Sequence, residues 1–311
     1  MEANLRWSAL TALAPIAWGA NYYVTREFLP AGHPLYGGVL RALPAGLLLL
    51  AACRRLPSGS WWWKSLVLGV LNMGGFFVLV YVAAQRLPTS VASIVMATAP
   101  LVLMLIAWAV LAERPGLRHL AGAAIGVGGV ALMLLTAAVD VDGAGLAASA
   151  GAMVMSCVGL VLAKRWSGGA GVLASTSWQL IGGGLVLLPA ALVAEGAPPA
   201  RDLPAVLGFG YVVVVATALS FAVWFAGLRR LPAATVGLIG LLNPVTGVLL
   251  GTVVAGESLT PQQICGLLLA LTGIALGRPA PPPPPAAPTD LHTEANHSGR
   301  PGGLNPFRSL P

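Results

Sequence analysis

One long segment occurs twice in the chain and limits what the chain can fold into. Residues 86–132 begin with Arg-Leu-Pro, and residues 230–276 begin with the same three residues. A shift of 144 residues superposes three landmark pairs without a gap: Leu87 on Leu231, Pro100 on Pro244 and Glu113 on Glu257. The matched positions are mostly proline, glutamate and glycine, so a shared preference for apolar residues does not explain them. The repeat indicates two halves built on one plan.

Each copy contains an uncharged stretch that is long enough to cross a membrane. Residues 89–112 and 233–256 each form a run of about 24 residues, which as an α-helix is roughly 36 Å long. A bilayer core is about 30 Å thick. Only 9% of the 311 residues are charged, against about 25% in soluble domains. So few charges cannot cover a surface in water, and we predict an integral membrane protein.

We predict an all-α polytopic membrane protein with ten transmembrane helices. The apolar runs lie at residues 7–25, 34–52, 62–84, 89–112, 117–139, 144–163, 170–194, 203–228, 233–256 and 260–277. The predicted units are residues 1–139, residues 140–277 and a disordered, Pro-rich cytoplasmic tail at residues 278–311. Because each repeat has five spans, the second repeat must enter the membrane from the opposite side. Such inverted repeats are typical of secondary transporters.

The basic residues of the loops predict the orientation of the chain. Cytoplasmic loops of membrane proteins carry an excess of Lys and Arg. With the N-terminus in the cytoplasm, 13 of the 17 Lys and Arg residues are cytoplasmic. Three are external, namely Arg26, Arg86 and Arg201, and Arg41 lies within a span. This distribution predicts that both termini are in the cytoplasm, and we expect the protein in the plasma membrane. The scattered basic residues do not form a nucleic-acid surface.

Polar and aromatic residues within the spans are candidate contacts for a solute. Trp18, Asn21 and Tyr22 share one face of the first helix, and a polar face in a membrane must face other helices. This face is interpreted either as a cavity wall or as a source of interhelical hydrogen bonds. The same alternatives apply to Asn72, Tyr81, Thr98, Ser156, Tyr211, Ser220, Trp224 and Asn243. For Asn243, a further interpretation is that it bonds the backbone group freed by Pro244.

Arg41 is the basic residue that lies well inside a span. A charge in the membrane costs at least about 2.5–3.5 kcal/mol, so Arg41 is a functional candidate. It is predicted to bind a substrate carboxylate or to hold a gate. Alternatively, it extends to the outer surface, because it follows Pro34 by only about seven residues. The span at 170–194 resembles that at 34–52 and carries neutral Gln179 at the comparable depth.

The repeated prolines and glutamates are predicted to have structural roles. Pro100 and Pro244 lie in the middle of their spans, where proline removes a helical hydrogen bond, and are candidate hinges. Glu113 and Glu257 end these spans, and we expect them to pair with loop arginines and to cap a neighbouring helix. No span has a carboxylate at mid-depth that would couple transport to protons.

Several of these motifs carry a family resemblance. They are Trp18-Gly19-Ala20-Asn21, Arg41, Ser177-Trp178-Gln179-Leu180 and the repeated pattern of Leu-Pro, Pro and Glu. On these residues, the segment 7–277 resembles the ten-helix EamA-type exporters of the drug/metabolite transporter superfamily. The sixth span departs from the symmetric pattern, because it has Ser156, Cys157 and Gly159 in place of Trp-Gly-x-Asn. The resemblance implies a secondary transporter that exports amino acids or related small metabolites by alternating access.

Other functions remain as alternatives: a drug or other metabolite carrier of the same superfamily, a membrane-embedded enzyme, or a non-transporting scaffold. An enzyme needs a nucleophile–base pair or a metal set at membrane depth. The sequence contains no G-x-S-x-G, H-E-x-x-H, C-x-x-C or Walker A motif, so we predict neither an enzyme nor an ATP-driven pump. We expect no metal and no cofactor. The expected partners are a small-molecule solute and the lipid bilayer but no nucleic acid, and the chain is expected to be a monomer or homodimer.

Overall fold

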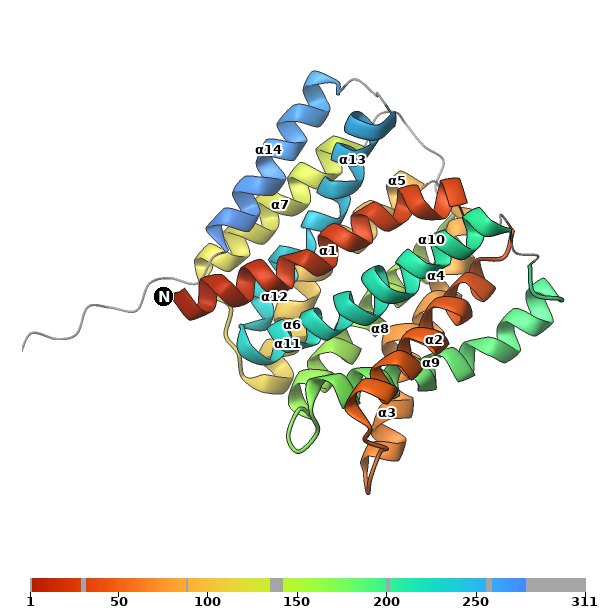
Figure 1. Cartoon of the computed structure of the whole chain (residues 1–311). Coiled ribbons are helices and arrows are strands. Elements are labelled where there is room, and N and C mark those ends of the chain that lie inside the picture. Colours follow the sequence, from red (N-terminus) through yellow and green to blue (C-terminus); the bar gives the residue numbers. More distant parts are fainter. Residues whose placement is uncertain are drawn as a thin grey trace, which may run out of the picture. The chain divides into compact units, whose positions relative to one another are not determined.

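The computed structural model describes residues 2–28, 32–87, 89–134, 142–199, 202–255 and 259–277. Within these residues every regular element is a helix (Figure 1). They belong to one compact unit, Met1–Pro279. Glu257 and the predicted tail at residues 278–311 lie outside the described residues.

The helices correspond to the ten predicted spans. In the first half, span 1 is α1 (Glu2–Phe28) and span 2 is α2 (Pro34–Cys53); span 3 consists of α3 (Trp61–Gly69), η1 (Val70–Gly74) and α4 (Gly75–Arg86); span 4 consists of α5 (Thr89–Ala97) and α6 (Ala99–Leu111); and span 5 is α7 (Leu117–Leu134). In the second half, span 6 is α8 (Gly143–Arg165) and span 7 is α9 (Val172–Glu195); span 8 consists of α10 (Leu203–Val213), η2 (Val214–Leu219) and α11 (Ser220–Arg230); span 9 consists of α12 (Ala233–Gly240) and α13 (Leu242–Ala255); and span 10 is α14 (Pro261–Leu276).

Most of these helices suit a membrane. Among the described residues, eight helical stretches are long and apolar enough to cross a bilayer. They correspond to spans 2–9. Helix α14 is apolar but has only 16 residues, and α1 has 27 residues but carries more polar side chains. The prediction of an all-α polytopic membrane protein is confirmed.

Four spans are interrupted at equivalent points of the two halves. Spans 4 and 9 are interrupted at Thr98 and Leu241, beside the candidate hinges Pro100 and Pro244. Spans 3 and 8 each contain a π-helical turn, and η1 and η2 begin 144 residues apart, at Val70 and Val214 respectively. A π-helical turn is wider than an α-helical turn and is frequent at functional sites. The sequence contains no proline in these turns and predicts one uninterrupted helix for each of spans 3 and 8, so the π-helical turns differ from the prediction.

Spans 5 and 10 pack closely through glycines and run in opposite directions. A methyl group on Gly122 would lie 2.6 Å from the carbonyl oxygen of Gly273, and one on Gly129 would lie 2.6 Å from that of Gly266. Residue numbers therefore rise along α7 as they fall along α14. The two helices lie side by side in Figure 1.

Spans 2 and 7 form a second antiparallel pair. A methyl group on Gly46 would lie 2.7 Å from Ile181 Cγ1, and one on Gly184 would lie 2.7 Å from Leu43 Cδ2. At the beginning of α2, the backbone nitrogens of Leu35 and Tyr36 donate to the carboxylate of Glu195 at the end of α9 (2.6 and 2.8 Å). This carboxylate satisfies two donors that a helix N-terminus leaves without partners.

The other spans also make equivalent contacts in the two halves. Span 1 packs on spans 8 and 9, and its counterpart, span 6, packs on spans 3 and 4. Spans 4 and 9 contact each other, with Gly237 of α12 against Pro100 of α6. Since equivalent spans pair with each other and run antiparallel, the two five-span repeats are inverted, as the sequence predicted.

Candidate functional site

Arg41 of α2 lies at the centre of the candidate site. Its Nε donates a hydrogen bond to Oγ1 of Thr217 (3.0 Å), and its Nη2 donates to the backbone carbonyl of Ala216 (3.3 Å). Both acceptors belong to the π-helical turn η2. The guanidinium carbon lies 5.5 Å from the ring centroid of Phe77 in α4. Arg41 therefore connects span 2 to spans 3 and 8.

Trp18 of α1 binds the same carbonyl as Arg41. Its Nε1 donates to the oxygen of Ala216 at 2.8 Å. Its ring packs against Phe221 and Trp224 of α11, with centroids 5.1 and 5.2 Å apart. Nearby, the hydroxyl of Tyr211 donates to the carbonyl of Ala17 (3.2 Å). Four predicted residues, from spans 1, 2 and 8, are thus brought together: Trp18, Arg41, Tyr211 and Trp224.

An open cavity of about 460 Å³ adjoins this cluster through Phe77. We call it the open vestibule. Its volume is in the range of small-molecule sites, about 300–1,000 Å³. Tyr81 is the predicted solute contact that lies here, and the residues lining the cavity are Gly32, Pro34, Phe77, Val80, Tyr81 and Gln85.

Asn72 and Gln179 form the corresponding contact in the other half. The Asn72 Nδ2 donates to Oε1 of Gln179 at 3.0 Å, and both side chains are buried. Asn72 lies in η1, as Ala216 lies in η2. Gly46 lies five residues after Arg41, and its symmetric counterpart Gly184 lies five residues after Gln179, so Arg41 and Gln179 occupy equivalent positions. The turn η1 therefore contacts the neutral amide of Gln179, and the turn η2 contacts the cationic Arg41.

Three further predicted residues, Thr98, Ser156 and Ser220, make no hydrogen bond to the cluster around Arg41 among the described residues. The hydroxyl of Thr98 donates to the carbonyl of Val95 (2.7 Å), and that of Ser220 donates to the carbonyl of Val215 (2.7 Å). These bonds stay within their own spans, as hydroxyl groups in helices often do. Ser156 is half-buried in α8.

Asn243 lies against the first span. A methyl group on Gly19 would be 2.6 Å from the backbone oxygen of Asn243, so the glycine of the Trp-Gly-Ala-Asn motif permits this close approach. The side-chain Oδ1 of Asn243 is buried and has no hydrogen-bond partner among the described residues. The side chains of Asn21 and Tyr22 lie outside the described part of the chain.

Glu113 joins three spans at the other end of the bundle. It forms an ion pair with Lys164 of α8 (2.6 Å) and accepts a hydrogen bond from the backbone nitrogen of Ala233 (2.9 Å). Lys164 also donates to the carbonyl of Leu231 (2.8 Å). The expected partner of Glu113 was a loop arginine, but α8 ends beside α6 and places a lysine there. The helix that Glu113 caps is α12, which begins span 9.

Sequence reasoning did not include Phe77 or Phe221 among the site residues, whereas Thr217 shares a predicted polar stripe with Ser220 and Trp224. A phenylalanine that faces a cavity has the same sequence signature as one that faces lipid. The repeat contained a usable signal, because the shift of 144 residues superposes Phe77 on Phe221. The backbone carbonyl of Ala216 had no signal, because its role depends on the π-helical turn.

With this geometry established, similar proteins identify the family. The EamA-like transporter family matches residues 5–135 and again residues 143–277. The chain belongs to this family. Protein PecM of Dickeya dadantii (strain 3937) is 36% identical over 265 residues, which cover 85% of this chain and 89% of PecM.

Two further similarities agree with membership of the EamA-like transporter family. A protein of Salmonella typhimurium named "Probable amino-acid metabolite efflux pump" is 28% identical over 286 residues, covering 85% of this chain and 92% of that protein. A solved crystal structure has the same fold, with a TM-score of 0.77 at 19% identity, covering 87% of this chain and 96% of the other. The chain is therefore a multi-pass membrane transporter, and its predicted resemblance to the drug/metabolite transporter superfamily is confirmed.

Proposed function

We propose that this protein is a secondary transporter that exports amino acids or related small metabolites across the plasma membrane by alternating access. The observation that carries the proposal is the position of Arg41 within span 2, where it contacts span 8 and the ring of Phe77, which lines the open vestibule. A charge at this depth is costly and marks a functional site by default. Among its relatives, the Salmonella protein is named for amino-acid metabolites.

The chemistry of the cluster suits a small solute that bears a carboxylate. A guanidinium group binds a carboxylate through two parallel hydrogen bonds. The bond from Arg41 Nη2 to Ala216 is 3.3 Å long, which exceeds the usual N–H···O distance of about 2.9–3.0 Å. A carboxylate can therefore replace this weak bond at low cost. The rings of Trp18, Phe221 and Trp224 offer an apolar surface to the remainder of the solute.

The two ends of the bundle differ, as alternating access requires. The open vestibule lies at the end of span 3, beside Gln85. At the opposite end, the ion pair between Glu113 and Lys164 joins the two halves. In this proposal residues 1–139 and 140–277 are repeats that exchange conformations, and the open vestibule faces outward with both termini in the cytoplasm.

A drug or multidrug carrier is the second candidate. The aromatic side chains around Trp18 favour it, because they also suit flat apolar cations. Such a solute would avoid the positive charge of Arg41, and the amino-acid class therefore remains our first choice. We do not propose an enzymatic activity.

The test is counterflow with the purified full-length protein in liposomes. Each of the radiolabelled L-amino acids is offered to liposomes preloaded with the same unlabelled amino acid. We expect at least one labelled amino acid to accumulate transiently. Trp18→Phe should raise the apparent KM for this amino acid about threefold to tenfold, because the hydrogen bond to Ala216 that holds the ring at position 18 is lost. If no amino acid exchanges but a cationic dye does, the second candidate replaces the first. A solute recovered in chemically altered form would indicate an enzyme.

A further inference from the structure

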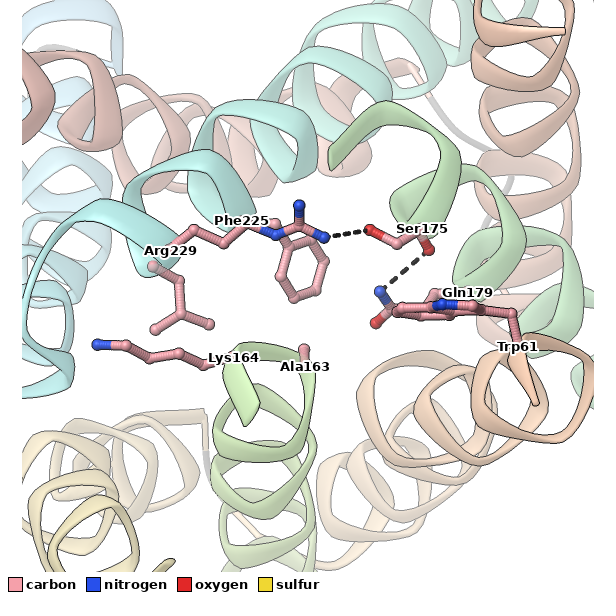
Figure 2. A pocket seen from close by; sticks show the side chains of 8 residues that line it. Trp61, Ala163, Lys164, Ser175, Gln179, Phe225 and Arg229 are labelled. Carbon is pink, nitrogen blue, oxygen red and sulfur yellow. Dashed lines mark hydrogen bonds between the residues drawn. The ribbon is translucent and has the colours of Figure 1, made fainter. Parts of the chain in front are cut away.

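A second, collapsed cavity lies at the end of the bundle opposite the open vestibule. Its volume is about 10 Å³, room for about one water molecule. Figure 2 shows the side chains that surround it, from α3, α8, α9 and α11. They are Trp61, Ala163, Lys164, Ser175, Gln179, Phe225, Leu228 and Arg229.

The repeat relates this cavity to the open vestibule. The shift of 144 residues carries Tyr81 to Phe225 and Gln85 to Arg229. Each pair contributes one residue to the open vestibule and one to the collapsed cavity. The two spaces therefore share two equivalent positions, on spans 3 and 8, and the collapsed cavity has further lining from Trp61, Ala163 and Lys164.

The side chains of the collapsed cavity are packed more tightly than their counterparts. Phe225 is 4% exposed, whereas Tyr81 is half-buried. Arg229 is also half-buried, whereas Gln85 is exposed. Both positions are thus less accessible in the collapsed cavity than in the open vestibule.

Arg229 connects span 8 to the beginning of span 7 through two directed hydrogen bonds. Its Nη1 donates to the backbone carbonyl of Ala170 (2.8 Å), and its Nη2 donates to the hydroxyl of Ser175 (3.1 Å). Gln179 donates to the carbonyl of Ser175 at 3.0 Å (Figure 2). Its Oε1 accepts from Asn72, which extends the network to span 3. Hydrogen bonds from a guanidinium are stronger than those from a neutral amide, and the equivalent residue of the open vestibule is the neutral Gln85.

We propose that the collapsed cavity is the second vestibule of the transporter, and that Arg229 is the positioning residue that keeps it closed. The proposal rests on the alternating access proposed above. When the two halves exchange conformations, the bonds of Arg229 to Ala170 and Ser175 break and this vestibule opens, while the vestibule beside Gln85 closes. The strength of the Arg229 bonds then sets the resting balance between the two states.

The test measures the accessibility of both vestibules in full-length protein without any solute. Single cysteines at Ala163 and at Val80, in a background free of the three native cysteines, report on the collapsed and the open vestibule respectively. The reagent is a membrane-impermeant maleimide, applied to protein in liposomes opened by freeze–thaw. We expect Arg229→Gln to raise the labelling rate of the cysteine at 163 about tenfold, and to lower the rate at position 80.

Arg230→Gln is the matched control, because it removes the same charge from the next residue. Arg230 is exposed and lies over the ring of Trp7, away from the cavity lining, so neither labelling rate should change by more than about twofold. Ser175→Ala removes one acceptor of Arg229 and should change both rates in the same directions as Arg229→Gln, by about threefold. Gln85→Arg should change both rates in the opposite directions.

Two results would overturn the proposal. One is an effect of Arg229→Gln and Ser175→Ala no larger than that of Arg230→Gln. The other is a rise of labelling at both reporter positions, which would indicate general loosening of the fold. Because no solute is used, reciprocal labelling in a protein that fails to transport would reject the proposed function but keep the two vestibules.

Discussion

Arg41 shows how a charged residue can be held within the membrane. Insertion of an arginine at the centre of a span costs about 2.5–3.5 kcal/mol or more. Arg41 offsets part of this cost through Thr217 and Ala216, and through the ring of Phe77, where a cation–π contact contributes about 0.5–2 kcal/mol. These contacts point the side chain across the bundle to span 8. That direction favours a substrate or gating role over the alternative that Arg41 extends to the outer surface.

Replacing Arg41 separates these roles. We expect Arg41→Ala to reduce counterflow at least about tenfold, because both bonds to span 8 and the carboxylate site are lost, while the amount of protein in the membrane falls less than about twofold. Arg41→Lys keeps the charge but not the planar fork, and should give an intermediate rate. Exposed Arg54→Ala is the control and should leave counterflow unchanged. Equal losses of counterflow and of membrane protein would instead assign Arg41 a structural role.

The sequence predicted the residues whose chemistry is unusual in a membrane. Arg41 and Trp18 stand out because hydrocarbon offers no partners to their polar groups. Phe77 and Phe221 do not, because an aromatic ring suits both lipid and a cavity. The acceptor shared by Arg41 and Trp18 is a backbone carbonyl, which every residue has. Such an acceptor is recognised only when the local helix geometry is known.

At the scale of elements, the interruptions of spans 4 and 9 were predictable and those of spans 3 and 8 were not. Pro100 and Pro244 lack a backbone donor, so a sequence directly predicts an interruption beside them. The π-helical turns η1 and η2 depend instead on packing. At the first turn, a methyl group on Gly69 would lie 2.6 Å from the backbone nitrogen of Gly183. This packing constraint on the first turn is recognised only from the close approach of the two backbones in the structure.

The glycines of α7 and α14 allow a sharp test of element packing. A methyl group on Gly129 would lie 2.6 Å from a backbone oxygen of α14, whereas one on the adjacent Gly128 would meet nothing within 4 Å. Gly129→Ala should therefore lower the free energy of unfolding by about 1–3 kcal/mol, because backbone atoms cannot move aside cheaply. Gly128→Ala should leave it unchanged or raise it. Unfolding of both variants by SDS in mixed micelles measures the difference, and equal effects would contradict the packing of spans 5 and 10.

At the scale of the whole molecule, the inverted repeat was predictable and the conformational difference between its halves was not. The matched prolines and glycines, and the odd number of spans in each half, follow from the sequence alone. Both halves encode nearly the same plan, however, so a sequence cannot tell which vestibule is open. That choice depends on small differences in packing and hydrogen bonding between equivalent sites, such as Arg229 and Gln85.

The direction of export depends on which end of the bundle faces the cytoplasm. The excess of Lys and Arg places the loop between spans 2 and 3 inside and the loop between spans 7 and 8 outside. Ser58 and Ala197 lie in these two loops and are exposed. In intact cells, an impermeant maleimide should label a cysteine at Ala197, and should label one at Ser58 only after the membrane is permeabilised. The reverse pattern would place the open vestibule in the cytoplasm and make it the side of solute entry, whereas labelling of both in intact cells would contradict the inverted arrangement of spans 2 and 7.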